Sequence, residues 1–238
     1  MERPVRQPLV PEDPAERRPR VRFSIVRDIV IAPRRAYASI LESRSWLGAY
    51  LVVIVAELVY LFATAPAVKH LAALAPAAAH PSAAQAGNAS RAYVANVALY
   101  DFVQPLLIWG LIAMTFTAVA RFKSQPVPFG SFFALAAATS VPAALGELVD
   151  ALAARLHAPG SYQNIKALVT AVPDNFALLA SPANEREVVF LSSFGLFDIW
   201  STVLLAYGFV TFARVRLTTA LALSFFLDVI FAFVFSAP

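Results

Sequence analysis

The sequence predicts an all-α, polytopic membrane bundle of five transmembrane helices, preceded by an amphipathic N-terminal segment. Of the 238 residues, 59% are hydrophobic and only 14% are charged. Soluble domains are about 45–50% apolar and about 25% charged, so this composition is typical of a membrane protein. Five stretches also reach the roughly 20 apolar residues that a helix needs to cross a hydrocarbon core about 30 Å thick.

The chain before the first span has two parts. Residues 1–22 are rich in Arg, Pro and Glu and lack helical or strand periodicity, which predicts a disordered cytoplasmic tail. Residues 23–44 carry apolar side chains at helical spacing on both sides of Pro33, a residue that suits the first turn of a helix. These apolar residues are Phe23, Val26, Ile29, Val30, Tyr37, Ile40 and Leu41.

Three arginines, Arg27, Arg34 and Arg35, are interleaved with those apolar residues. Two interpretations remain open. The arginines can be the basic flank that orients a membrane protein. Alternatively, the segment can dock on the anionic inner leaflet or on a partner protein.

The transmembrane domain is expected over residues 45–237. Its five spans are placed at 45–66, 94–120, 129–153, 189–213 and 217–237. The third span is rich in alanine and contains Pro142, and small residues let helices approach closely, so we expect it inside the bundle. Between the third and fourth spans, Ile165, Leu168 and Val169 recur at helical spacing, which predicts a short helix that seals the outer face.

Basic residues predict the orientation. Fourteen Lys and Arg residues lie before the first span or in the two connections on its side, and five lie on the opposite side. By the positive-inside rule, the N-terminus is expected in the cytoplasm and, after five crossings, the C-terminus outside. The net charge of +4 therefore reflects a membrane flank, and we expect the bilayer rather than nucleic acid as partner.

Acidic residues within the predicted spans are the main candidates for a functional site. Glu57 and Asp228 lie near mid-membrane, whereas Asp101, Glu147 and Asp198 lie in the outer halves of three different helices. An ionised Asp at the centre of such a helix costs about 2.5–3.5 kcal/mol. Two hypotheses follow. Either each acid bonds to its own donor on a neighbouring helix, or the three outer acids share one polar cavity that opens outward and holds protons or a cation.

Enzymatic functions find little support in the residues. The chain has no cysteine, and its three histidines are scattered rather than spaced as metal ligands. Nucleophile-elbow, phosphate-loop and zinc-protease motifs are absent from the sequence. We therefore expect no catalytic residues, no metal and no cofactor.

Three stretches together resemble a known family. They are APRRAYASI before the first span, PFGSFFALAAATSVPAAL in the third and LFDIWSTVLLAYGFV in the fourth. The residues that mark them are Pro142, Phe197, Trp200, Leu204, Leu205 and Gly208. In this order the stretches resemble the Yip-domain membrane proteins, five-helix proteins named for interaction with Rab-type GTPases, and specifically their bacterial branch. The resemblance covers residues 24–236.

The chain departs from that family at two places. Bacterial members carry an acidic residue ahead of the aromatic residue, whereas here Gly195 stands in that region and Asp198 follows Phe197. The aspartate-tyrosine-glycine-proline signature of the eukaryotic members is absent as well. GTPase binding is therefore not carried over to this chain.

The resemblance implies a bacterial inner-membrane protein without catalytic residues. It implies a scaffold or accessory subunit that binds other membrane proteins, such as the components of an ABC-type exporter. The buried acids favour an alternative, a transporter or permeation protein that uses them for protons or cations. The sequence leaves open the partner, the cargo and the oligomeric state, including a homo-oligomer.

Overall fold

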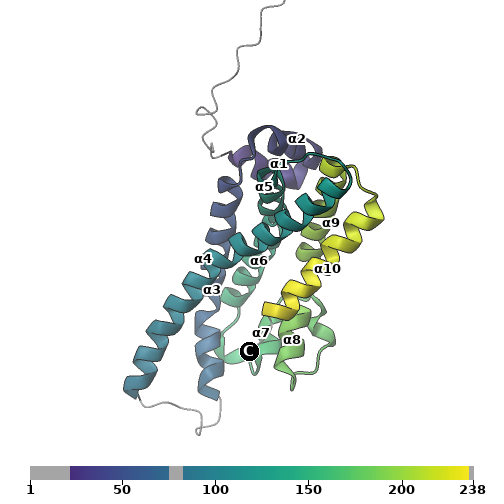
Figure 1. Ribbon diagram of the computed structural model, residues 1–238. Helices are drawn as coiled ribbons and strands as arrows, with labels where there is room; N and C mark the ends of the chain where they lie inside the picture. Colours follow the sequence, from purple (N-terminus) through teal and green to yellow (C-terminus); the bar gives the residue numbers. More distant parts are fainter. Residues whose placement is uncertain (1–21, 75–82, 236–238) are drawn as a thin grey trace, which may run out of the picture.

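The computed structural model describes residues 22–74 and 83–235, with side chains described in the second range only from Phe102 onward. The predicted tail at 1–22 lies outside these residues apart from Arg22. The described part of the chain has no strand, and it contains five helices long and apolar enough to cross a membrane (Figure 1). The predicted fold class is therefore confirmed.

The helices of the described residues run in the following order. They are α1 (Phe23–Ile31), α2 (Pro33–Ser43), α3 (Leu47–Leu74), α4 (Ala83–Phe122), α5 (Phe129–Thr139), α6 (Val141–Leu156), α7 (Ile165–Val169), α8 (Glu185–Ser192), α9 (Leu196–Ala213) and α10 (Leu217–Phe235). Two short 3-10 turns, Pro159–Ser161 and Phe176–Leu179, flank α7. The helix pairs in most extensive contact are α3 with α6, α4 with α5, α9 with α10, α1 with α2, and α6 with α9.

Two ends of the bundle can be told apart in Figure 1. The cap end bears α1 and α2 together with the connections α4–α5 and α9–α10, and the loop end bears α7 and α8. The apolar spans that join the two ends are Leu47–Leu74, Phe102–Phe122, Phe129–Leu156, Leu196–Ala213 and Leu217–Val234. The third of them is 61% buried within the protein, against at most 39% for any other, as its alanine content predicts.

The third span is broken in its middle. It consists of α5 and α6, which meet at Ser140, and the fully buried Pro142 lies in the first turn of α6. A proline cannot donate to the preceding turn, so a helix at this place releases backbone groups that need other partners. One of them, the Ala143 N–H, donates to the Ser201 hydroxyl of α9 over 3.0 Å. A neighbouring span therefore stabilises the break.

The fourth span is shorter than the sequence predicts. Residues 189–192, expected as its first turn, belong to α8, and α9 begins only at Leu196. The Gly195 N–H donates to the Asp198 carboxylate over 3.0 Å, and such an acid in the first turn is a start signal for a helix. Hydropathy overlooks this signal because it averages the apolar residues on both sides of Gly195.

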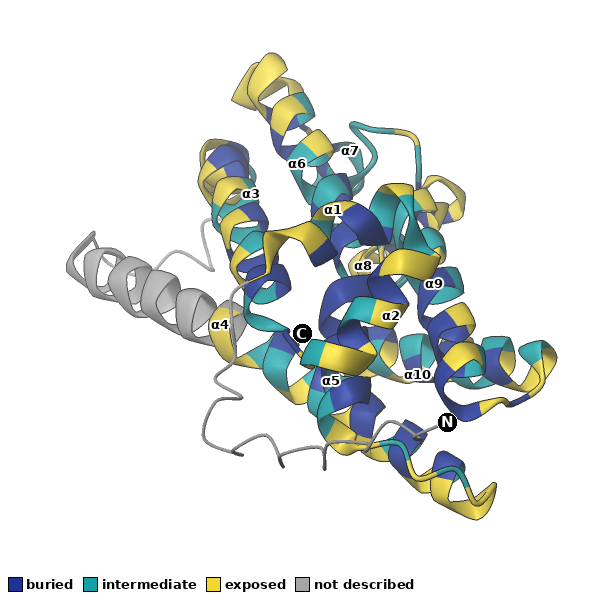
Figure 2. Ribbon diagram, turned by 90° about the horizontal axis from the view of Figure 1, so that it is seen from above, coloured by how far each residue is buried: buried dark blue, intermediate teal, exposed yellow. Residues whose placement is uncertain are grey.

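The amphipathic segment 23–44 forms a cap on the bundle. It folds into α1 and α2, with Pro33 in the first turn of α2 as predicted. Figure 2 looks down on this end, where both helices lie across the ends of the spans. Tyr37 reaches furthest, and its hydroxyl donates to the Leu204 carbonyl oxygen of α9 over 2.8 Å. Burial raises the pKa of Tyr37, so the phenol keeps the proton that it donates.

The buried face of the cap differs from the predicted one. Ile29 and Ile40 are fully buried, but Phe23 is 56% exposed and Leu41 is 40% exposed. The reason is that periodicity identifies an apolar stripe but not the neighbour that covers it. Arg27, Arg34 and Arg35 all lie on the exposed side, and Arg27 forms an ion pair with the buried Asp28.

Candidate functional site

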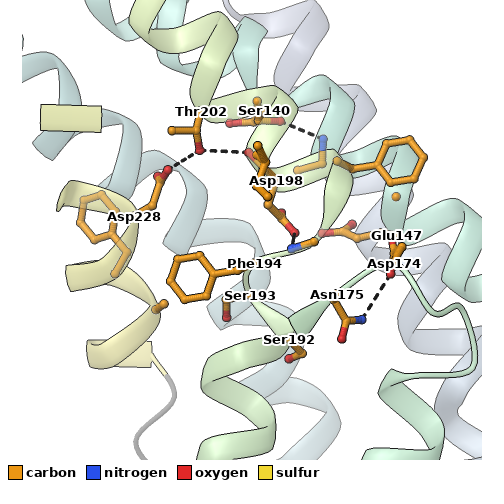
Figure 3. A pocket seen from close by; sticks show the side chains of 18 of the residues that line it. Ser140, Glu147, Asp174, Asn175, Ser192, Ser193, Phe194, Asp198, Thr202 and Asp228 are labelled. Atoms are coloured by element: carbon orange, nitrogen blue, oxygen red, sulfur yellow. Dashed lines mark hydrogen bonds between the residues drawn. The ribbon is translucent and has the colours of Figure 1, made fainter. Parts of the chain in front are cut away.

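A cavity of about 810 Å³ lies between the spans toward the loop end. Its walls come from all five spans and from the loops around α7 and α8. Five acids among the described residues line it: Glu147, Asp150, Asp174, Asp198 and Asp228. Figure 3 labels all of them except Asp150. Among the residues whose side chains the structure describes, no Lys, Arg or His lines it. The cavity is therefore strongly acidic and is of the size that small-molecule sites have.

Asp198 has a structural role at one wall of this cavity. As the acid in the first turn of α9, it accepts the Gly195 N–H described above. Such backbone N–H groups have no partner within their own helix, and the helix dipole favours a negative charge beside them. The local fold therefore explains why an acid stands here, although its second carboxylate oxygen is left for the cavity.

Asp228 reaches the cavity from the middle of α10. Its carboxylate contacts the hydroxyl of Thr202, which lies one turn beyond Asp198 in α9 (Figure 3). The same hydroxyl lies 3.0 Å from the backbone carbonyl oxygen of Asp198. A hydroxyl has one proton to donate, so Thr202 shares it between these two acceptor oxygens. Asp228, Thr202 and Asp198 thus form one connected polar group.

The break in the third span is accompanied by further polar groups in the cavity. The Trp109 indole N–H donates to the Ser140 hydroxyl over 2.9 Å, and that hydroxyl donates to the Ala136 carbonyl oxygen over 3.0 Å. Ser140 and Ser201 both line the cavity. The proline break therefore holds hydroxyl groups at a depth where an unbroken apolar helix would present none.

A folded loop positions Asp174 at the mouth of the cavity. The Asn175 amide donates to the Val169 carbonyl oxygen over 2.8 Å, and its oxygen accepts the Ala177 N–H. The loop is also bonded to the start of α9, because the Leu196 N–H donates to the Asp174 carbonyl oxygen over 3.0 Å. The helix predicted around Ile165 is present as α7. It is part of the loop between α6 and α9 that holds Asp174, which we call the closing loop.

The residues expected as a site are placed as follows. Glu147 and Asp198 line the same cavity, as the shared-site hypothesis requires, and Asp228 lines it too. The Asp101 side chain lies outside the described residues, and Glu57 is not among the lining residues. Within the described part of the chain, no group of three or more His, Asp or Glu is arranged to hold a metal ion.

The sequence argument missed two acids, Asp150 and Asp174. A signal for Asp150 was available, because it stands three residues after Glu147 and so shares a helix face with it. No such signal exists for Asp174. Its place depends on the fold of a loop that brings it beside the start of α9.

The residues that mark the Yip-domain resemblance are packing residues in this fold. A Cβ at Gly146 would lie 3.0 Å from the Phe197 side chain, so α6 and α9 are in close contact there. Trp200 is partly buried against the main core. Gly208 permits an even closer approach, since a Cβ there would lie 2.3 Å from a methyl carbon of Leu135.

Comparison with known proteins identified no relative of the chain. No family model, curated protein or solved structure matches it.

Proposed function

We propose that this multi-pass membrane protein binds a positively charged ligand in the acidic cavity, as a transporter or permeation protein does. The observation that carries the proposal is a cavity of about 810 Å³ that, among the described side chains, is lined by five acids and by no basic residue. Of the two functions expected from the sequence, this one has the more specific geometric support.

The carboxylates that line the cavity need a positive charge to balance them. Carboxylates in a poorly hydrated site are stable as ions only when a positive charge or several donors balance them. Asp198 has the Gly195 N–H and Asp228 has the Thr202 hydroxyl, but neither partner is a cation. Protons or a cation from outside the protein would supply the missing charge, and a group that leaves and returns makes such a cavity useful for transport.

Neutralising single acids tests the proposal. We expect the thermal unfolding midpoint of the purified wild-type protein to rise with tetramethylammonium or sodium chloride. The rise should be lost in Asp228→Asn and in Asp198→Asn, because asparagine keeps the shape and the hydrogen-bonding oxygen but removes the charge. A ligand at 100 times its Kd stabilises a protein by about 2.7 kcal/mol, which a midpoint measurement detects.

A matched control is Glu42→Gln, which removes one exposed acid from the cap. It should respond to both salts as the wild type does. Equal responses from all four proteins would contradict binding in the cavity and would leave each acid with a structural role only.

The orientation of the loop end has its own test. A single cysteine introduced at the exposed Ser161, on the loop end, should be labelled in intact cells by a thiol reagent that cannot cross the membrane. A shielded cysteine would show that this end does not face the cell exterior.

A second function, that of an accessory subunit, is favoured by the cap. Arg27, Arg34 and Arg35 lie exposed on a rigid surface that is held by buried residues of α1 and α2. We propose that this surface faces the bacterial cytoplasm and binds another membrane protein, with an ABC-type exporter component as the candidate that the Yip-domain resemblance suggests. Neither proposed function requires a catalytic residue.

Changing the three arginines to glutamine should then release a partner. The measurement is quantitative mass spectrometry of proteins that co-purify after crosslinking in cells. The control changes Arg121, Lys123 and Arg216, which are exposed at the same end but outside the cap, and it removes the same charge. If both triple variants and the wild type co-purified with the same proteins, the cap arginines would serve only to orient the protein in the membrane.

A further inference from the structure

The cavity has two unlike sides, and this difference identifies its ligand more closely. The acids lie on α6, α9, the closing loop and the inward face of α10. Apolar side chains of α4 and α10 form another part of the lining, which we call the apolar side: Ile108, Ile112, Leu221, Phe225 and Phe231. A small hydrated ion has no use for the apolar side. The inference that follows rests on the proposed function and concerns the same site.

The apolar side belongs to two helices that are not packed on each other. Within the described residues, α4 packs mainly on α5 and α10 packs on α9, and α4 with α10 is not among the closely packed pairs. In Figure 1 both helices run obliquely from the cap end toward the loop end. Because both line the cavity, it extends to the gap between them.

That gap faces the bilayer. On α10, Phe225 lines the cavity and is nevertheless 55% exposed, and on α4 Leu111, beside the lining residue Ile112, is 48% exposed. Such apolar surfaces on spanning helices are in contact with lipid. A molecule dissolved in the membrane could therefore reach the cavity sideways, without passing through water.

The depth of the acids fits such a route. Asp228 is eleven residues from the start of α10 at Leu217, which places it about 17 Å along a helix that rises about 1.5 Å per residue. A free cation at that depth would lose most of its hydration, but the carboxylates of Asp228 and Asp198 offer it compensating charge. An apolar tail on the same molecule would remain between α4 and α10.

We infer that the ligand is a cationic amphiphile, a molecule with one ammonium-type head and an alkyl tail, which enters from the bilayer between α4 and α10. Its head lies among Asp198, Asp228 and Thr202, and its tail lies against Ile108 and Phe225. The aromatic ring of Phe194, which also lines the cavity, adds a face that attracts an ammonium head.

The test compares two quaternary ammonium ions that differ only in their tail. The protein is placed in nanodiscs of phosphatidylcholine, and the unfolding midpoint is followed against dodecyltrimethylammonium and tetramethylammonium, both below micelle formation. We expect the long-chain ion to half-saturate the shift at a concentration at least about tenfold lower, because its tail concentrates it in the membrane. Dodecyl sulfate, with the same tail and a negative head, should give no such shift.

Two variants separate entry from membrane partitioning. Ile108→Trp narrows the gap from the side of α4 and should abolish the advantage of the long-chain ion. Leu107→Trp is the matched control, because the neighbouring residue faces lipid and does not line the cavity. Asp228→Asn should lose the response to both ions.

The outcomes distinguish the two proposals. Equal potency of the two ammonium ions would overturn lateral entry and leave cation binding from water intact. An unchanged response in Ile108→Trp would overturn it as well. A shift with dodecyl sulfate equal to that with the long-chain ion would show insertion of the tail without charge recognition. Absence of any response to either ion would contradict the proposed function itself. The comparison of chain lengths uses the wild type, so it holds even where a variant fails to fold.

Discussion

Replacing Ile29 or Ile40 by alanine is expected to destabilise the whole bundle, by about 2–5 kcal/mol for each variant. Both side chains are fully buried, one in each helix of the cap. Their loss leaves cavities at the place where α1 and α2 meet the spans, because the surrounding helices are held by the bilayer and cannot collapse freely. The measurement is the free energy of unfolding of the purified protein in a mixed micelle.

Phe23→Ala and Leu41→Ala are the matched controls for these variants. They remove apolar side chains of similar size from the same two helices, but Phe23 is 56% exposed and Leu41 is 40% exposed. Exposed substitutions of this kind usually change stability by no more than about 0.5 kcal/mol. If the buried and exposed pairs had equal effects, α1 and α2 would lie on the membrane surface and the cap would not exist.

Gly208→Ala is expected to lower stability by about 1–3 kcal/mol through a clash between α9 and α5. The added Cβ would lie 2.3 Å from one methyl carbon of Leu135 and 2.9 Å from the other. Leu135 is fully buried, so its side chain cannot turn away into solvent. The nearby ring of Phe209 is stacked on Phe116 with centroids 3.9 Å apart, so a shift of α9 would also disturb this stack.

Gly110→Ala separates the clash from the general effect of alanine in a helix. Gly110 lies in α4, and a Cβ there would meet nothing within 4 Å. Alanine is favoured over glycine in a helix by about 1 kcal/mol, so this variant should be neutral or slightly stabilised. If the thermal unfolding midpoints of both variants were above that of the wild type, or both below it, the clash would be refuted. Restoration of stability by Leu135→Ala in the Gly208→Ala background would confirm the contact directly.

Single-sequence reasoning succeeded where a property depends only on local composition. The membrane class and the number of spans follow from apolar length, because lipid demands that every backbone polar group be satisfied within its own helix. The break at Pro142 and the start of α2 at Pro33 follow from the missing N–H and the restricted backbone of proline. The exposed arginines of the cap belong to the same class, since charge alone keeps them out of the core.

Properties that depend on which helices meet could not be read in this way. Between spans there is little hydrophobic driving force, because lipid is as apolar as the side chains, so shape decides the contacts. The approach of Gly208 to Leu135 is one such contact, and the burial of Ile29 instead of Phe23 is another. The start of α9 at Leu196 was misplaced because a carboxylate cap, rather than hydropathy, sets it.

The candidate site also has features that could be predicted from the sequence and features that could not. The sequence alone determined that acids such as Glu147, Asp198 and Asp228 lie in apolar spans without a basic residue beside them, which already requires compensation of their charge. Only the tertiary structure decided that they share a cavity, that the loop adds Asp174 to it, and that α4 and α10 both line it without packing closely on each other. The physical reason is that charge and hydropathy are sums over single residues, whereas a cavity exists only where several helices fail to fill the space between them.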